Sequence, residues 1–193
     1  TKAKIIAITG SNGKTTTTLL IGHILKNAGF DVLVAGNIGT GFSKSLLERD
    51  YEYIVLELSS FQLDGIKDFK ADISILLNIH PDHLDRYDFK FENYVKSKLR
   101  ITENQTKDDV FIFNYDDKNI VENIKTKAKM IPITLLDKLD SEGAFYKNEQ
   151  INIGVNMTYL FKLIKTINNS DILTLFLEDN DINKLGVKIE NSD

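Results

Sequence analysis

The first half of the chain alternates short β-branched and aliphatic runs with segments whose apolar residues recur every three or four positions. This alternation is typical of a parallel sheet whose strands are joined by crossover helices. Several predicted strands are apolar throughout, as expected when helices cover both faces of the sheet. We therefore predict an α/β fold, with strands at Lys4–Thr9, Val32–Ala35, Tyr53–Leu58, Ile73–Ile79, Val110–Asn114 and Met130–Ile133, and helices at Thr15–Ala28, Thr40–Glu48, Phe91–Asn104 and Lys118–Lys127.

The pattern changes beyond about residue 139. Ala144–Lys147 and Gln150–Ile153 flank a polar Asn-Glu pair and predict a small β-hairpin appendage. Residues 154–193 are rich in Asn, Ile and Lys and give no clear element. We therefore divide the chain into a main domain, residues 1–139, and a remainder, residues 140–193, that either completes this domain or stays unassigned.

Composition narrows the class of protein. The 24 Lys and Arg residues against 28 Asp and Glu give a formal charge of −4, without the basic stripe that nucleic acids require. The lack of cysteine excludes disulfides and thiolate metal sites and fits a reducing cytosol. The chain has no apolar run long enough to cross a membrane, and it opens on a strand instead of a signal peptide, like a piece of a longer protein. These features predict a cytoplasmic protein that binds neither nucleic acid nor membranes.

A phosphate-binding loop is predicted where the first strand meets the first helix. Residues 5–16 read as strand, glycine-containing turn and helix, an arrangement that directs backbone N–H groups and a helix N-terminus at an anion. Lys14 would reach the β- and γ-phosphates, and the Thr15 hydroxyl would bind Mg²⁺. General P-loops have glycine where Ile8 stands here. The following helix supports the interpretation with one apolar face, formed by Leu20, Ile21, Ile24, Leu25 and Ala28.

Polar residues also occur at the ends of the predicted strands Tyr53–Leu58 and Ile73–Ile79. Glu57 ends one strand, at the edge where parallel sheets bind ligands, and could hold a hard cation or be an ordinary strand-end charge. The other strand leads into a segment with two histidines and two aspartates, for which cation binding, catalysis and a plain loop held by Asp–Arg pairing all remain open. His23, by contrast, is predicted on the solvated side of its helix. The two histidines and two aspartates that follow the strand Ile73–Ile79 are His80, Asp82, His83 and Asp85.

Lys98 falls inside an apolar helical stripe that comprises Phe91, Tyr94, Val95 and Leu99. Burial disfavours the ammonium form, so a lysine in this position needs a partner or a lowered pKa. A neutral amine can react with CO₂ to give an anionic carbamate, which binds metals. The alternative is a lysine whose stem packs while its ammonium group reaches water.

Five motifs resemble those of the Mur ligase family and follow one another along the chain in the family's order, over roughly residues 3–117. The family's phosphate loop, Thr-Gly-x-Asn-Gly-Lys-Thr-Thr, matches Thr9–Thr16 and accounts for Ile8. Glu57–Leu63 is typical of the family branch that adds D-glutamate. The other three motifs are Gly36–Gly39, Asp82–Tyr87 and Lys98–Ile101.

The resemblance implies a role for each matching residue. Lys14, His83 and Lys98 would be catalytic, with Lys98 carrying a carbamate derived from CO₂. Two Mg²⁺ ions would be held by Thr15, Glu57, His83 and Lys98, and the precursor substrate by Asn37 and Ser59. ATP would be bound by Gly10, Ser11, Asn12, Gly13, Lys14, Thr15 and Thr16.

The implied reaction joins D-glutamate to UDP-N-acetylmuramoyl-L-alanine in peptidoglycan precursor synthesis. ATP phosphorylates the precursor carboxylate, and the amine then attacks the acyl phosphate.

One family motif is matched only weakly. The family has a Gly-x-His-Asn motif whose asparagine approaches the adenine of ATP, and the segment Gly154–Asn156 lacks its histidine. We expect a monomeric chain that folds but is inactive alone. Two alternatives are a folylpolyglutamate synthetase-like ligase and a non-catalytic nucleotide-binding module.

Overall fold

The computed structural model describes residues 2–38, 49–136, 143–145, 172–178 and 181–190. These residues belong to two compact units, residues 1–146 and residues 147–193. The predicted helix at 40–48 and the predicted boundary at residue 139 lie outside the described residues.

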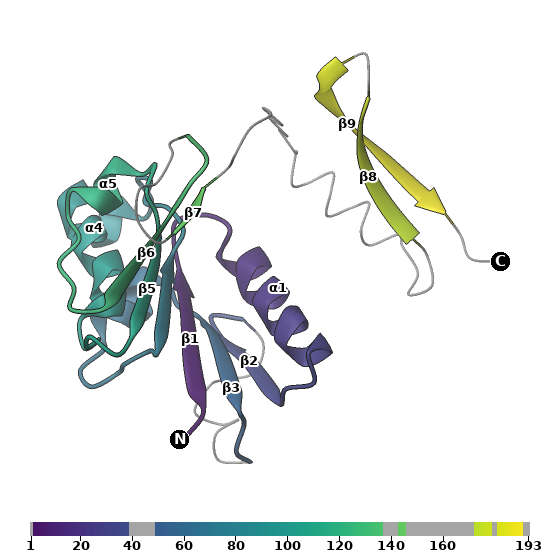
Figure 1. The fold of residues 1–193 in the computed structure, drawn as a ribbon. Coiled ribbons are helices and arrows are strands. Elements are labelled where there is room, and N and C mark those ends of the chain that lie inside the picture. The colour runs from purple at the N-terminus through teal and green to yellow at the C-terminus, as the bar shows by residue number, and fades with distance from the viewer. Residues whose placement is uncertain (1, 39–48, 137–142, 146–171, 179–180, 191–193) are drawn as a thin grey trace. The chain divides into compact units, whose positions relative to one another are not determined.

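The first unit contains a seven-stranded sheet in which every strand pair is parallel (Figure 1). The predicted α/β fold is thereby confirmed. In spatial order the strands are β2 (Val32–Gly36), β3 (Tyr53–Glu57), β1 (Lys4–Thr9), β4 (Ile73–Leu76), β5 (Val110–Asn114), β6 (Lys129–Thr134) and β7 (Ala144–Phe145).

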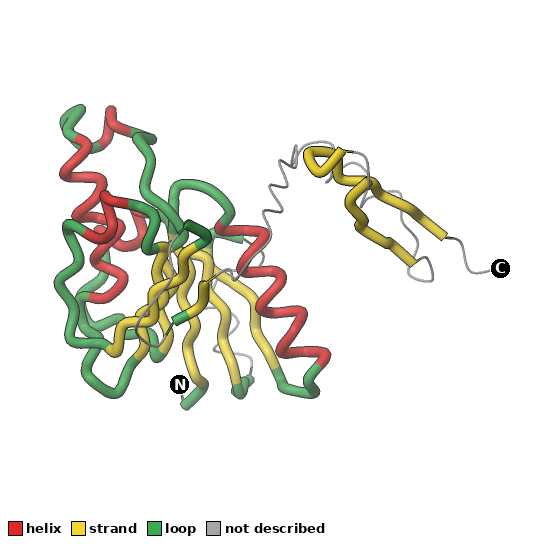
Figure 2. Tube along the Cα trace, turned by 45° about the horizontal axis from the view of Figure 1, so that its top comes forward, coloured by secondary structure: helices red, strands yellow, loops and turns green. Residues whose placement is uncertain are grey.

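Helices lie on both faces of the sheet (Figure 2). Helix α1 (Lys14–Asn27) covers β1, β2 and β3 on one face, where Ile21 and Leu25 pack on Ile8 and Val55. The opposite face packs against the segment that contains α3 (Ser60–Asp64), η1 (Leu84–Arg86), α4 (Phe91–Leu99), η2 (Arg100–Thr102) and α5 (Lys118–Val121).

Small residues of α1 face the sheet, contrary to part of the prediction. Thr18 and Gly22 are buried, whereas Leu20 and Ile24 are each 55% exposed. The reason is close packing, because a Cβ atom added at Gly22 would lie 2.4 Å from a Val34 methyl group. Part of the predicted apolar face, namely Leu20 and Ile24, therefore lies outside the contact between α1 and the sheet.

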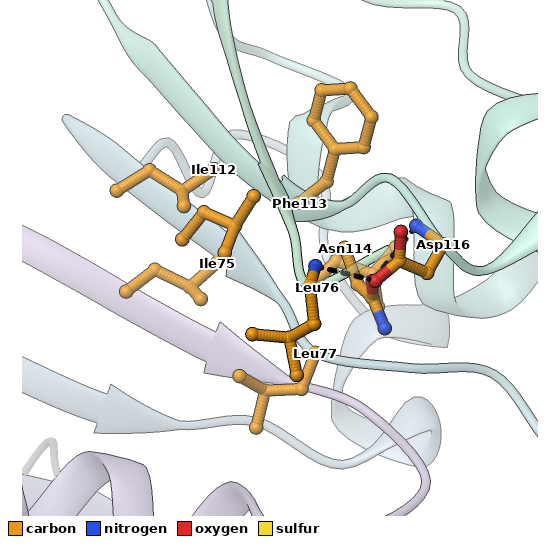
Figure 3. A pocket seen from close by; sticks show the side chains of 9 residues that line it. Ile75, Leu76, Leu77, Ile112, Phe113, Asn114 and Asp116 are labelled. Atoms are coloured by element: carbon orange, nitrogen blue, oxygen red, sulfur yellow. Dashed lines mark hydrogen bonds between the residues drawn. The ribbon is translucent and has the colours of Figure 1, made fainter. Parts of the chain in front are cut away.

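One half of the α1 face of the sheet is more open than the other. Ile8, beneath α1, is fully buried. Its register partner Ile75 and the register partner of Ile75, Ile112, are half-buried, and Ile133 on β6 is 42% exposed. An apolar cavity of about 260 Å³ lies there, with Ile75 and Ile112 side by side (Figure 3). No element in the described part of the chain covers it.

Three sequence-predicted elements are clearly shorter in the structure, and the first is the strand predicted at Ile73–Ile79, which ends at Leu76. The helix predicted to reach Asn104 ends at Leu99 and continues as η2, where the Thr102 hydroxyl donates to the Leu99 carbonyl at 3.0 Å. Helix α5 has four residues instead of ten, and no long apolar stripe follows it to be buried. Of the predicted hairpin, the structure describes Ala144–Phe145, a strand that pairs in parallel with the free edge of β6. The rest of that hairpin lies outside the described residues.

The second unit contains an antiparallel pair, β8 (Ile172–Glu178) and β9 (Asp181–Glu190), with a register irregularity near Glu178. The sequence did not predict this pair. In neither unit does a helix among the described residues have the length and apolar character needed to span a membrane.

Candidate functional site

The predicted phosphate loop follows β1 and leads into α1. Gly10 and Gly13 have φ angles of 157° and 81°, and a Cβ at Gly10 would lie 3.1 Å from the Leu77 side chain. Such backbone suits glycine. Lys14 Nζ donates to the Gly10 and Ser11 carbonyls, both at 2.9 Å, so the ammonium group lies against the loop that it is predicted to serve.

The loop is fastened to the segment after β4. Asn12 N–H donates to Asn78 Oδ1 at 2.9 Å, and Asn78 Nδ2 donates to the Asn12 carbonyl at 3.1 Å. Ser11 Oγ donates to the His80 carbonyl and accepts from the His80 N–H, both at 2.9 Å. The Ser11 N–H also donates to the Asn78 carbonyl at 3.0 Å, so two residues of the phosphate loop are held by five hydrogen bonds to the segment that carries the histidine–aspartate cluster.

Glu57 lies at the carboxyl end of β3 and is only 2% exposed. Its carboxylate accepts from Thr15 Oγ1 at 2.8 Å and from Asn37 Nδ2 at 3.1 Å. Gly36 makes this approach possible, because at φ 112° an added Cβ would lie 2.2 Å from the Glu57 carbonyl. Three predicted site residues therefore meet beside the phosphate loop.

Lys98 is 2% exposed, which excludes the alternative in which its ammonium group reaches water. Nζ donates to the Gly10 carbonyl at 2.8 Å and to Thr9 Oγ1 at 3.2 Å. Burial and the nearby positive charge of Lys14 lower the pKa of Lys98 from 10.5 to about 7, against smaller opposing effects of nearby carboxylates. Near neutral pH, a large fraction of Lys98 is therefore an uncharged amine beside the phosphate loop.

Two other predicted residues make different contacts. The side chain of His83 is exposed, and its backbone has a φ angle of 48°. Its Nε2 lies 3.5 Å from Asp82 Oδ2, and its ring packs on that of Phe61 with ring centroids 5.3 Å apart. Ser59 caps α3 reciprocally with Gln62, so its hydroxyl already serves the helix terminus. His23 is exposed, as predicted.

A divalent cation fits part of this arrangement. The Thr15 hydroxyl and the buried Glu57 carboxylate supply oxygen ligands on adjoining elements, as Mg²⁺ prefers. Within the described residues, no three His, Asp or Glu side chains form a group that could hold a metal. Two oxygen donors suited to a cation are therefore adjacent, and His83 makes no contact with them among the described residues.

Two residues at the site were missed by the sequence analysis. Asn78 clamps the phosphate loop, and its position at the carboxyl end of a predicted strand was the available signal. Tyr94 is 1% exposed, and its hydroxyl lies 3.1 Å from Ser11 Oγ. Its place in an apolar helical stripe indicated only packing.

Comparisons with known proteins show the family of the chain. The family model of the Mur ligase middle domain matches residues 8–182. The UDP-N-acetylmuramoylalanine–D-glutamate ligase of Christiangramia forsetii is 50% identical over 157 residues, which are 80% of this chain and 35% of the relative. The enzyme of the same name from Bacteroides fragilis is 48% identical over 156 residues, 79% of this chain and 35% of that protein. The chain thus spans about a third of the length of these curated relatives.

Solved structures share the fold. A UDP-N-acetylmuramoyl-L-alanyl-D-glutamate–2,6-diaminopimelate ligase superposes with a TM-score of 0.58 at 22% identity, covering 77% of this chain and 35% of that one. The Thermotoga maritima MurF ligase in complex with ADP gives a TM-score of 0.58 at 16% identity, covering 97% and 40%.

Proposed function

The chain belongs to the Mur ligase family, and on that premise we propose that it is the ATP-binding part of a ligase that joins D-glutamate to UDP-N-acetylmuramoyl-L-alanine. The observation that carries the proposal is the joint placement of a phosphate loop, a buried carboxylate and a buried lysine. Thr15 contacts Glu57, and Lys98 contacts Gly10. A module that only binds nucleotide has no evident use for the last two groups.

The proposed reaction has two steps. A carboxylate oxygen of the precursor attacks the γ-phosphorus of ATP, which forms an acyl phosphate and releases ADP. The amine of D-glutamate then attacks the acyl carbon, the C–O bond to phosphate breaks, and the nitrogen loses a proton as the amide forms. The protein needs no nucleophile of its own for this chemistry, and its task is positioning and charge stabilisation.

The phosphate loop and Lys14 would bind the phosphates of ATP. The contacts of Lys14 with the Gly10 and Ser11 carbonyls would be exchanged for phosphate oxygens, which are stronger partners for an ammonium group. Thr15 and Glu57 would hold a first Mg²⁺, which neutralises charge on the transferring phosphoryl group. Asn37, which reaches the Glu57 carboxylate, and Ser59 would lie against the precursor.

Lys98 would carry a carbamate. Its neutral Nζ would attack the carbon of CO₂, an N–C bond would form, and one proton would leave to solvent. The lowered pKa of Lys98 makes the neutral amine available near pH 7. The carbamate would exchange contact with the Gly10 carbonyl for a second Mg²⁺, with Glu57 and His83 as further ligands. We place the reaction in the cytoplasm, with the protein acting as a monomer.

An isotope experiment on the intact protein tests the proposal. The precursor is labelled with ¹⁸O in its terminal carboxylate and incubated with Mg²⁺, ATP and D-glutamate. An acyl phosphate intermediate requires one labelled oxygen to appear in the released phosphate. Phosphate without label would exclude the proposed chemistry, and binding of ATP without turnover would favour the non-catalytic module.

A further inference from the structure

Ser11 is the centre of a buried hydrogen-bond cluster that joins three elements of the first unit. It is 8% exposed and lies in the phosphate loop. Its Oγ contacts the backbone of His80, after β4, and the hydroxyl of Tyr94, on α4. His80 and Tyr94, which follow Ser11 in sequence by 69 and 83 positions, therefore both contact the Ser11 hydroxyl group.

The direction of each hydrogen bond follows from the capacity of a hydroxyl group. A serine Oγ has one proton to donate and two lone pairs to accept with. The His80 carbonyl can only accept, so it takes the Ser11 proton, and the His80 N–H occupies one lone pair. The Tyr94 hydroxyl must then donate to the remaining lone pair, at 3.1 Å. Ser11 Oγ is thus fully bonded, and Tyr94 holds it in that orientation.

Tyr94 also neighbours Lys98, another buried polar residue of the site. It precedes Lys98 by four residues, one helical turn, so both side chains leave α4 on the same face. Lys98 Nζ lies 5.3 Å from the centre of the Tyr94 ring. One face of α4 therefore contacts the phosphate loop twice, at Ser11 through Tyr94 and at Gly10 through Lys98.

The cluster connects the two parts of the proposed site. The phosphate loop would bind ATP, and the segment that begins at His80 contains His83, proposed to lie near the acceptor. The nucleotide loop has another, separate tie through the Asn12–Asn78 pair, which does not involve Tyr94. Loss of the tyrosine hydroxyl would therefore leave the loop formed, with the Ser11 N–H still bonded to the Asn78 carbonyl at 3.0 Å, but would remove one of the three hydrogen bonds that orient Ser11 Oγ toward His80.

We propose that Tyr94 is a positioning residue that, through Ser11, fixes the phosphate loop relative to the His80–Asp85 segment for phosphoryl transfer. This inference rests on the proposed function for its kinetic consequence but not for its structural one. A small misplacement of reacting groups lowers the rate of the chemical step more than it weakens substrate binding.

The kinetic test compares Tyr94→Phe with the unchanged intact protein. We expect kcat to fall about tenfold, which is the effect of losing about 1.4 kcal/mol of transition-state stabilisation, while the KM for ATP changes less than about twofold. Ser11→Ala combined with Tyr94→Phe should lower kcat no further than Ser11→Ala alone, because the tyrosine acts through the serine. An unchanged kcat, a purely additive double variant, or an effect confined to KM would each overturn the proposal.

A matched control separates positioning from general stability. Ser74→Ala also removes a buried hydrogen bond between β4 and the segment after α4, from Ser74 Oγ to the Ile101 carbonyl at 3.1 Å, but it touches neither loop of the site. It should lower the melting temperature about as much as Tyr94→Phe and leave kcat unchanged. If Ser74→Ala lowers kcat equally, Tyr94 is only structural and the proposal fails.

Amide hydrogen exchange supplies a readout that does not depend on turnover. The His80 N–H donates to Ser11 Oγ, so its exchange should accelerate about tenfold in Tyr94→Phe and stay unchanged in Ser74→Ala. Equal exchange in both variants would overturn the structural part of the proposal. A protein without ligase activity that still shows this difference would contradict the proposed function and leave the cluster intact.

Discussion

Replacement of Lys98 by methionine should change how the stability of the protein depends on pH. The unfolded lysine has a pKa of 10.5, whereas burial lowers the pKa of the folded group to about 7. Above pH 10.5 the side chain is neutral in both states and contributes nothing to this dependence. As the pH falls below 10.5, the unfolded state binds a proton that the folded state binds only near pH 7. The free energy of unfolding must therefore decrease through this window.

The size of the effect follows from the two pKa values. The full window corresponds to about 5 kcal/mol, and the part between pH 9 and pH 7 to about 2 kcal/mol. Lys98→Met keeps an apolar stem of similar length and removes the titrating group. Its free energy of unfolding should therefore rise relative to that of the unchanged protein by about 2 kcal/mol as the pH is lowered from 9 to 7.

Urea unfolding followed by circular dichroism measures this difference, since the chain has no tryptophan for fluorescence. The buffers must be free of CO₂ so that the amine stays unmodified. Lys96→Met is the matched control, because Lys96 lies on the same helix but is exposed, and it should leave the dependence on pH unchanged. Parallel curves for Lys98→Met and the unchanged protein between pH 7 and pH 9 would refute the reasoning.

Three further substitutions test other parts of the site. Lys14→Ala in the intact protein should abolish nucleotide binding measured by calorimetry, and an unchanged affinity would exclude the phosphate-loop assignment. Gly36→Ala should destabilise the protein by about 3 kcal/mol in urea unfolding, because its Cβ would overlap the Glu57 carbonyl at a positive φ; a loss below about 1 kcal/mol would contradict this packing. Lys98→Ala should lose ligase activity that added short-chain carboxylic acids partly restore, and full activity without them would refute the carbamate.

The sequence predicted those parts of the fold that follow from local patterns. The strands before and after the phosphate loop are short apolar runs, and their parallel pairing follows from the intervening helices. The burial of Lys98 could be predicted because helical periodicity placed it among apolar neighbours. Thr15 and Glu57 could be predicted to lie near each other because both follow carboxyl ends of strands in one sheet.

Other features depend on contacts that no local pattern records. The face of α1 that packs on the sheet carries small residues because Val34 lies against Gly22. This contact could be predicted only by knowing which strand the helix crosses. The parallel pairing of β7 depends on the free edge of β6. The hydroxyl of Tyr94 contacts Ser11, which is 83 positions away in sequence, so the apolar stripe that contains Tyr94 could not predict this contact.

The most direct test of the proposed function is phosphate release by the intact protein. The reaction contains Mg²⁺ and ATP with UDP-N-acetylmuramoyl-L-alanine and D-glutamate, and each of the last three is omitted in turn. The account predicts that phosphate appears only when all three are present, in amounts equal to the new amide. Phosphate release that is independent of either the precursor or D-glutamate, or its absence from the complete mixture, would contradict the account.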